Sequence, residues 1–274
     1  MEHKIIVIGG ANADIGGLPA AELVLRDSNP GSISISQGGV GGNICRALRA
    51  LGDSVSFITA FGDDLIAGFL REGCERDGID ISLSKHCPGR SSSVYMYIAD
   101  GSGNMHVAVN DMEIVNEITP SFLASRIEDI NSFEACVLDA NLTREAIEYL
   151  AENVSVPLYA DPVSTIKGVK LKGLLDRFTA IKPNELEAEV LGDIPCRCYT
   201  SAGADGVYAS DGEEKVHVPA PKTETKNTNG CGDAAIAAIV HAELEGMNLQ
   251  QTAGFAVKTA TKKATLNCAM TPKC

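Results

Sequence analysis

Residues 227–233 read Asn227-Thr228-Asn229-Gly230-Cys231-Gly232-Asp233 and lead directly into an Ala- and Ile-rich segment, 234–244. Two glycines flank one small residue, which lets the backbone approach a ligand closely. The apolar segment predicts a buried helix, and the N–H groups at the start of a helix attract anions. Gly230, Cys231 and Gly232 are therefore candidates for an anion hole that binds phosphate.

Asp233 falls in the first turn of this predicted helix. A carboxylate would repel a phosphate bound in the same loop. It has a use there if it takes the proton of a hydroxyl group that attacks the phosphorus. This makes Asp233 a candidate catalytic base. The alternative is that Asp233 only stabilises the helix start through the helix dipole, and the local sequence leaves both interpretations open.

The composition indicates a single α/β domain, 1–274. Of the 274 residues, 45% are hydrophobic but only 5% are aromatic, and there is no Trp. Cores of Val, Ile, Leu and Ala are typical of parallel sheets covered by helices. The formal charge of −13 argues against nucleic acid or an anionic membrane as partner. We expect no signal peptide and no membrane span, since no apolar run approaches the roughly 20 residues that a span needs.

The nine cysteines are an odd number scattered along the chain, with Cys196 and Cys198 as the only close pair. Together with five dispersed His residues, they form no recognisable zinc framework. We therefore expect reduced cysteines in a cytoplasmic protein.

Strand-like and helix-like segments alternate along most of the chain, as in repeated β-α units. The predicted strands are 4–9, 55–60, 135–138, 158–160, 180–182, 198–200 and 207–210. The predicted helices are 44–51, 65–76, 119–130, 143–152, 185–191, 233–245 and 249–264.

Two segments, about 12–37 and 92–112, interrupt this alternation. Residues 32–36, 94–98 and 105–109 alternate between polar and apolar side chains, which predicts strands with one solvated face. We expect these pieces to form a small antiparallel sheet inserted into the α/β domain. Such a lid could close over a ligand or pair with a second subunit, as a homodimer.

A second glycine-rich stretch, Gly38-Gly39-Val40-Gly41-Gly42-Asn43, opens the predicted helix 44–51. It is not a Walker loop, because no Lys-Ser/Thr follows the glycines, and its spacing does not match the dinucleotide-binding fingerprint. A sugar ring lying against the glycines, with a hydroxyl bound to Asn43, is an equally good physical use.

Polar side chains follow the ends of several predicted strands. Because the carboxyl ends of parallel strands meet at one edge of a sheet, they outline a single cleft. They are Asn12, Asp14, Asp139, Asn141, Asp161, Asn184 and the loop 230–233.

These motifs, in this order, resemble the ribokinase-like (PfkB) carbohydrate kinase family. Residues 227–234 are similar to its C-terminal signature Asp-Thr-x-Gly-Ala-Gly-Asp, and 38–43 to its N-terminal glycine motif. Residues 182–187 are similar to its Asn-x-x-Glu motif, and 201–206 to its nucleotide-binding turn. The resemblance implies a three-layer α/β/α fold with a mostly parallel central sheet and a small β-sheet lid.

The resemblance also implies ATP-dependent phosphorylation of a primary hydroxyl group, with Asp233 as base and Gly230, Cys231 and Gly232 as anion hole. Glu187 would bind Mg²⁺ through water, and Asp161 is a weaker metal candidate. The residues implied to hold the substrate are Asn12, Asp14, Gly38, Gly39, Asn43, Asp139 and Asn141. The residues implied to lie along the nucleotide are Asn184, Ser201, Gly203 and Gly206.

Further stretches, 27–31, 111–112, 139–142 and 161–164, resemble family members that phosphorylate the 5′-hydroxyl of pseudouridine. Ser28 and Asn29 in the lid turn become substrate candidates on this basis. Ribokinase or adenosine kinase specificity is the alternative. Adenosine kinases are expected to stack aromatic side chains of the lid on the base, and this makes Tyr95, which lies near Tyr97 in a lid strand, a further substrate candidate. A non-catalytic ligand sensor on the same fold is a remote alternative. Asn227 replaces the usual Asp of the signature, which leaves activation by a monovalent cation open.

Overall fold

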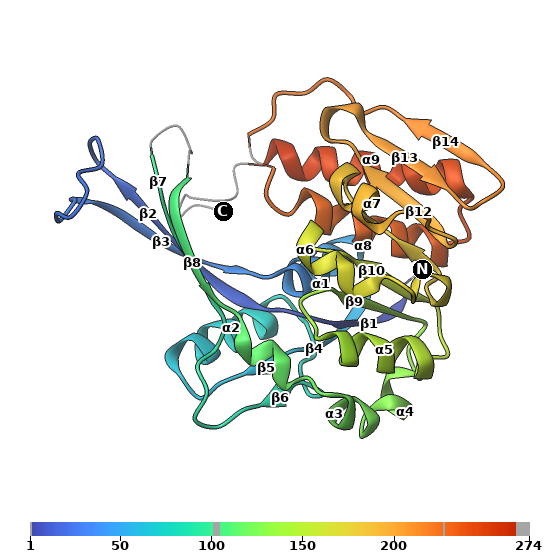
Figure 1. The fold of residues 1–274 in the computed structure, drawn as a ribbon, viewed down its shortest axis with the longest axis horizontal. Helices are drawn as coiled ribbons and strands as arrows, with labels where there is room; N and C mark the ends of the chain where they lie inside the picture. Colours follow the sequence, from blue (N-terminus) through green and yellow to red (C-terminus); the bar gives the residue numbers. More distant parts are fainter. Residues whose placement is uncertain (1, 101–104, 227, 267–274) are drawn as a thin grey trace.

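The structure is a computed structural model that describes residues 2–100, 105–226 and 228–266. Its centre is an eight-stranded sheet with the order β14-β13-β12-β11-β10-β9-β1-β4 (Figure 1). Neighbouring strands from β4 to β12 are parallel, whereas β13 and β14 pair antiparallel at one edge. The strands are β1 (Lys4–Ile8), β4 (Ser54–Ile58), β9 (Ala135–Asp139), β10 (Leu158–Asp161), β11 (Ala180–Ile181), β12 (Arg197–Ser201), β13 (Val207–Ser210) and β14 (Lys215–Val218).

Strand β1 supplies apolar side chains to both faces of this sheet. Ile5 and Val7 belong to one buried cluster, and Ile6 and Ile8 to another on the opposite face. All four side chains are fully buried. A short continuous apolar run is therefore explained by a strand that is covered on both faces.

Helices cover both faces and give the molecule three layers (Figure 1). On the face of Ile5 and Val7 lie α1 (Val40–Leu51), α2 (Leu65–Arg76), α8 (Cys231–Leu244) and α9 (Leu249–Thr265). On the other lie α3 (Pro120–Ala124), α4 (Ile127–Ile130), α5 (Arg144–Asn153) and α7 (Glu185–Leu191), with α6 (Thr165–Gly168) against α7. The expected three-layer α/β/α fold with a mostly parallel sheet is confirmed.

Short elements complete the chain. They are the two-stranded sheet β5 (Ala60–Phe61) and β6 (Lys85–His86), and the 3₁₀ helices η1 (Glu113–Glu117), η2 (Val169–Leu171), η3 (Leu175–Arg177) and η4 (Gly203–Asp205). Among the described residues, no helix is long and apolar enough to cross a membrane.

A four-stranded lid with the order β3-β2-β7-β8 extends away from the central sheet (Figure 1). Its strands are β2 (Asn12–Pro19), β3 (Gly31–Gly38), β7 (Val94–Ala99) and β8 (Met105–Asp111). The expected lid sheet is confirmed, but β2 and β7 pair in parallel. Sequence analysis also missed β2 as a strand, because Gly16 and Gly17 interrupt its alternation.

The two lid faces differ in chemistry. Residues paired across strands share a face, and the pairing puts Asp14, Tyr95 and Tyr97 on one side. The opposite side is apolar, and several of its side chains are 49–77% exposed. We call this side the outer lid face, and its exposed residues are Ile33, Ile35, Met96, Val107 and Val109.

The predicted helix 119–130 is divided into α3 and α4. The hydroxyl of Ser125 donates a hydrogen bond to the carbonyl of Phe122 at 2.7 Å, and the guanidinium of Arg126 lies 4.0 Å from the Phe122 ring centroid. Such local side-chain bonds compete with continuation of a helix.

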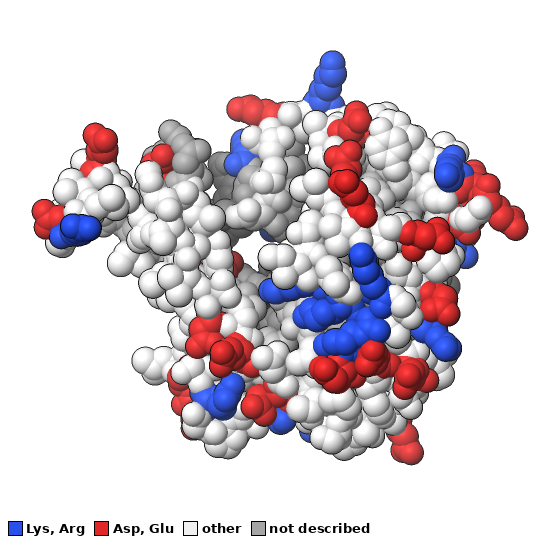
Figure 2. Space-filling view, in the orientation of Figure 1, with Lys and Arg blue, Asp and Glu red and all other residues white. Residues whose placement is uncertain are grey.

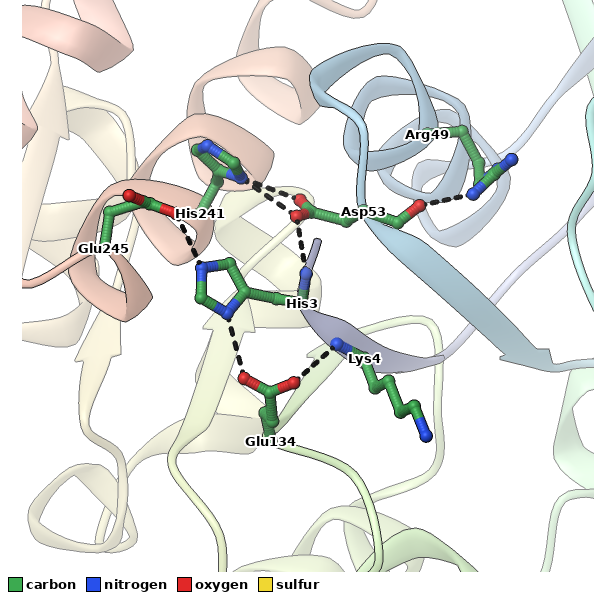
Figure 3. A network of polar contacts seen from close by, with 7 residues as sticks. All are labelled: His3, Lys4, Arg49, Asp53, Glu134, His241 and Glu245. Atoms are coloured by element: carbon green, nitrogen blue, oxygen red, sulfur yellow. Dashed lines mark hydrogen bonds and ion pairs between the residues drawn. The ribbon is translucent and has the colours of Figure 1, made fainter. Parts of the chain in front are cut away.

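The C-terminal end of α8 is held by a polar network around buried His3 and Asp53 (Figure 3). Nδ1 of His241 lies 3.0 Å from Asp53, in the turn between α1 and β4. The ring of His3, just before β1, contacts Glu134 at 2.9 Å and Glu245 at 3.1 Å. These contacts tie the end of α8 to β1 and to the turns beside it, while the other end of α8 carries the candidate site.

Candidate active site

The candidate site lies where the carboxyl ends of β1, β9, β10 and β11 meet the start of α8. Gly230 is the N-cap of α8 and has a φ of 74°, in the left-handed region that favours glycine. Cys231, Gly232 and Asp233 form the first helical turn. The N–H of Cys231 donates to the carbonyl of Thr228 at 3.2 Å. Gly230, Cys231, Gly232 and Asp233 all remain partly exposed, so a ligand can reach this helix start.

The carboxylate of Asp233 faces helix α1. The side-chain amide of Asn43 donates a hydrogen bond to Oδ2 of Asp233 at 2.7 Å. Arg46, one turn further along α1, donates to Oδ1 of Asn43, also at 2.7 Å. Burial, and after it the negative charge of Asp161, raise the pKa of Asp233 to about 7, although Lys182 and Asn43 act in the opposite direction. A carboxyl group with this pKa can accept a proton at neutral pH.

Lys182 and Asp161 form a buried ion pair beside Asp233. Their side chains approach to 2.9 Å between Nζ and Oδ2, and they are 7% and 4% exposed. The other carboxylate oxygen of Asp161 accepts the N–H of Val163 at 2.8 Å. Asp161 is therefore committed to two donors, and as a metal ligand it would have to give up Lys182.

Asp139 lies fully buried beneath the glycine-rich start of α1. Its Oδ2 accepts the N–H groups of Gly10 at 2.9 Å and Gly41 at 2.8 Å, and Oδ1 accepts that of Asn141 at 2.8 Å. Burial raises its pKa to about 6. The carboxylate thus joins the ends of β1 and β9 to α1. Asn141 stays partly exposed, and its Oδ1 accepts a hydrogen bond from Nζ of Lys167 at 2.6 Å.

Asn12 and Asp14 lie at the base of the lid. The amide of Asn12 donates to Oδ1 of Asp14 at 2.6 Å, and burial raises the pKa of Asp14. A Cβ on Gly38 would lie 2.2 Å from Oδ2 of Asp14, so any other residue at 38 would displace this carboxylate. Gly39 has a φ of 88°, and a Cβ at this position would lie 2.5 Å from the carbonyl oxygen of Gly10.

The other lid candidates lie farther out. The hydroxyl of Tyr95 donates a hydrogen bond to the sulfur of Met105 at 3.2 Å. The ring centroids of Tyr95 and Tyr97 are 5.7 Å apart. Ser28 and Asn29 are in the turn between β2 and β3, at the tip of the lid (Figure 1). The amide of Asn29 bonds the backbone of Val24 at 2.8 and 2.9 Å, so it stabilises this turn.

Asn184 and Glu187 form a capping box at the start of α7. Oδ1 of Asn184 accepts the N–H of Glu187 at 2.9 Å, and Oε2 of Glu187 accepts that of Asn184 at 2.8 Å. Glu187 is buried, and burial raises its pKa. Carboxylate and amide oxygens are the ligands that Mg²⁺ accepts, so this donor set fits the expected metal.

The expected nucleotide turn lies next to this box. Ser201 pairs with Asn184 in a parallel bridge, and its N–H donates to the carbonyl of Pro183 at 2.9 Å. Gly203 and Gly206 have φ values of 54° and 97°. A Cβ on Gly206 would lie 2.0 Å from the carbonyl of Val218, which explains a glycine there. Asn227 lies outside the described residues.

A cavity of about 440 Å³ opens between α1 and α9 and reaches Asn43 and Gly230. Basic side chains dominate its charged lining, which consists of Arg46, Lys258, Lys262 and Lys263. It offers positive charge close to the helix start.

Sequence analysis did not single out Lys182 or Arg46 as functional residues. Lys182 is a charged residue at the end of an apolar strand, and Arg46 follows Asn43 by three positions on one helix face. Those signals were present, but only the folded chain puts Lys182 against Asp161 and Gly232.

The chain is similar to known proteins over most of its length. The model of the pfkB family carbohydrate kinases matches residues 2–195 and 197–272. Pseudouridine kinase of Escherichia coli is 35% identical over 92% of this chain and 87% of that protein.

Two solved structures show the same fold. A carbohydrate kinase from Agrobacterium tumefaciens superposes with a TM-score of 0.86 at 29% identity, covering 97% of this chain and 92% of that one. Arabidopsis thaliana ribokinase complexed with ribose and ATP superposes with a TM-score of 0.83 at 18% identity, covering 98% and 95%. The chain belongs to the pfkB family of carbohydrate kinases, and it is a phosphotransferase that acts on an alcohol group.

Proposed function

We propose that the protein transfers the γ-phosphoryl group of ATP to the 5′-hydroxyl of a ribonucleoside, with pseudouridine as the leading substrate. The observation that carries this proposal is the position of Asp233. It lies in the first turn of α8, beside Gly230 and Gly232, and its carboxylate is held by Asn43 of α1. A kinase that consumes ATP fits the cytoplasm, where we propose that it acts.

In the proposed step, the hydroxyl oxygen of the nucleoside attacks the γ-phosphorus. The bond from that phosphorus to the β–γ bridging oxygen breaks, and ADP leaves with the bonding electrons. Asp233 accepts the hydroxyl proton, which its pKa of about 7 allows. The helix start at 230–233 stabilises the negative charge on the transferred group.

The other candidates divide between two substrates. Asn12, Asp14, Gly38, Gly39 and Asn43 would hold the ribose, with Asn141 at the neighbouring strand end. ATP would lie along the turn 201–206 and α8–α9. Glu187, through water, and Asn184 would hold Mg²⁺, which neutralises charge on the β- and γ-phosphates when it is bound.

The choice of pseudouridine draws on the E. coli relative, whose name is pseudouridine kinase. Ribokinase or adenosine kinase specificity is the alternative, and the Tyr95–Tyr97 ring pair would favour a base over a free sugar. A non-catalytic sensor is disfavoured, because it has no use for a carboxylate inside an anion hole. A panel of pseudouridine, uridine, adenosine and ribose with ATP and Mg²⁺ tests these alternatives. Turnover of none of them would contradict the proposal.

We also propose that the outer lid face binds a second copy of the chain. Large exposed apolar side chains share this face, and the middle of the lid carries no charged side chain on the side drawn in Figure 2. Patches of this kind on a soluble protein mark interaction sites. A two-fold dimer would bury the same residues from both subunits.

A further inference from the structure

Lys182 lies at the end of β11 with 6% of its surface exposed. Lysine is rarely buried so completely, because its ammonium group loses hydration. The carboxylate of Asp161 supplies a counter-charge, because its Oδ2 lies 2.9 Å from Nζ of Lys182.

The ammonium group points at the middle of the anion hole. A Cβ on Gly232 would lie 2.9 Å from Nζ of Lys182, and no other described atom outside the adjoining part of α8 comes within 4 Å of that position. The negative charges of Asp233 and Glu187 also act on Lys182. A side chain at position 232 would therefore displace the ammonium group, which lies directly against the first turn of α8.

Asp161 is held in place by an unfavourable turn. Val163 has a φ of 66°, which β-branched residues strongly disfavour. The N–H of Ser164 closes the turn on the carbonyl of Pro162 at 2.7 Å, and the N–H of Val163 bonds Asp161 at 2.8 Å. Strain of this kind concentrates at functional sites, and here it aims one carboxylate oxygen at Lys182.

We propose that Lys182 binds the phosphoryl group during its transfer and that Asp161 is the positioning residue that holds Lys182 against Gly232. This inference rests on the proposed kinase activity. Lys182 keeps its proton throughout and forms no covalent bond. Its charge acts on the oxygens of the transferred group from beside the first turn of α8.

An interaction made in the transition state changes kcat more than substrate affinity. Lys182→Met should therefore lower kcat by about 10²–10³-fold, as loss of a single stabilising donor does, with the nucleoside KM within a few-fold. Lys182→Arg should recover part of this loss. Exposed Lys172, replaced by Met, is the matched control and should keep wild-type kinetics.

Removing the charges of both Lys182 and Asp161 distinguishes a structural role of the ion pair from a catalytic role of Lys182. Lys182→Met alone leaves Asp161 buried without its cation, whereas Lys182→Met combined with Asp161→Asn removes both charges. If the double variant melts like the wild type but stays at least about tenfold slower, Lys182 acts in catalysis. Recovery of wild-type kcat in the double variant would overturn the proposal.

Binding of inorganic phosphate, measured by calorimetry, needs no turnover. It should weaken in Lys182→Met and not in Lys172→Met, whereas ADP, which lacks the transferred group, should bind the two variants alike. Equal phosphate affinities in the two variants would also overturn the inference. Wild-type protein that phosphorylates nothing in the substrate panel would refute the kinase proposal instead.

Discussion

The side-chain amide of Asn43 donates a hydrogen bond to the carboxylate of Asp233 at 2.7 Å across 190 residues of chain. One residue belongs to the N-terminal glycine motif and the other to the C-terminal signature. The bond joins the helix that begins beside the lid to the helix that begins at the anion hole. It favours the ionised form of Asp233, against the effect of burial.

Asp233→Asn keeps the size of the side chain but removes the base. We expect kcat to fall by about 10²–10⁴-fold, while ATP and nucleoside still bind. Steady-state kinetics and calorimetry on the same preparation check both parts. A variant within a few-fold of wild-type kcat would contradict the assigned role.

Asp233→Asn should be more stable than the wild type at alkaline pH, although its kcat is lower. Folding raises the pKa of Asp233 from about 4, the value in an unfolded chain, to about 7. The unfolded state therefore loses this proton at lower pH than the folded state does, and the free energy of unfolding falls as the pH rises from about 4 to about 7. Asp233→Asn should therefore melt at a higher temperature than wild type at pH 8. The difference should vanish as the pH falls toward 4.

The pH dependence of the reaction should follow the same carboxyl group. Only ionised Asp233 accepts a proton, so kcat/KM should rise with pH and level off above about pH 7. Asn43→Ala removes a hydrogen bond that lowers this pKa, and it should move the rise to higher pH. Asn153→Ala, at the exposed end of α5, is the control. An unchanged profile in Asn43→Ala would show that another group controls the acidic limb.

Local sequence patterns were enough for most of the core. Helix 65–76 and the strand beginning at Lys4 follow directly from apolar periodicity. Strand β2 was missed because its side chains are partly glycine, and its pairing with β7 joins distant segments. The Asp161–Lys182 pair was missed for a related reason, since an ion pair between two strand ends depends on the strand order.

Asp139 shows a further limit of strand-end reasoning. The pattern correctly places it at the carboxyl end of β9, but three backbone N–H groups occupy its carboxylate. Which polar groups face a ligand and which hold the backbone is decided by neighbours that are remote in sequence.

Glu187→Gln should raise the Mg²⁺ concentration needed for half-maximal activity more than it raises the nucleoside KM. A glutamine oxygen can still accept the N–H of Asn184, so the start of α7 should survive. Without its negative charge, the side chain at 187 attracts the hydrated Mg²⁺ ion less strongly. Glu185→Gln, an exposed change in the same turn, is the control. If the magnesium titrations of wild type and Glu187→Gln superimpose, Glu187 does not bind the metal and only caps the start of α7.

The proposed dimer should depend on the outer lid face. Ile33→Lys and Val107→Lys put charges on side chains that are 77% and 55% exposed, and burying two unpaired charges is costly. Analytical ultracentrifugation should show a dimer for wild type and a monomer for these variants. Leu65→Lys, at a 92% exposed site on α2, should remain dimeric. A wild-type monomer at the highest soluble concentration would refute the proposal.

Specificity for pseudouridine should show in the comparison with uridine. The C-glycoside pseudouridine has a ring N–H beside the sugar that uridine lacks, and a site that bonds this donor leaves a buried acceptor unpaired with uridine. We expect pseudouridine to be preferred by at least about tenfold in kcat/KM, or roughly 1.4 kcal/mol.

The lid supplies the test of this preference. Ser28 is exposed at the tip of the lid, and Ser28→Ala should narrow the ratio without abolishing turnover if the closed lid brings its hydroxyl to the base. Asn29→Ala should narrow it by loosening the turn, since the amide of Asn29 bonds the backbone of Val24. Equal rates on both nucleosides, or a clear preference for adenosine or a free sugar, would refute the pseudouridine assignment. The kinase assignment would survive that result, because transfer depends on Asp233 and the helix start rather than on the lid.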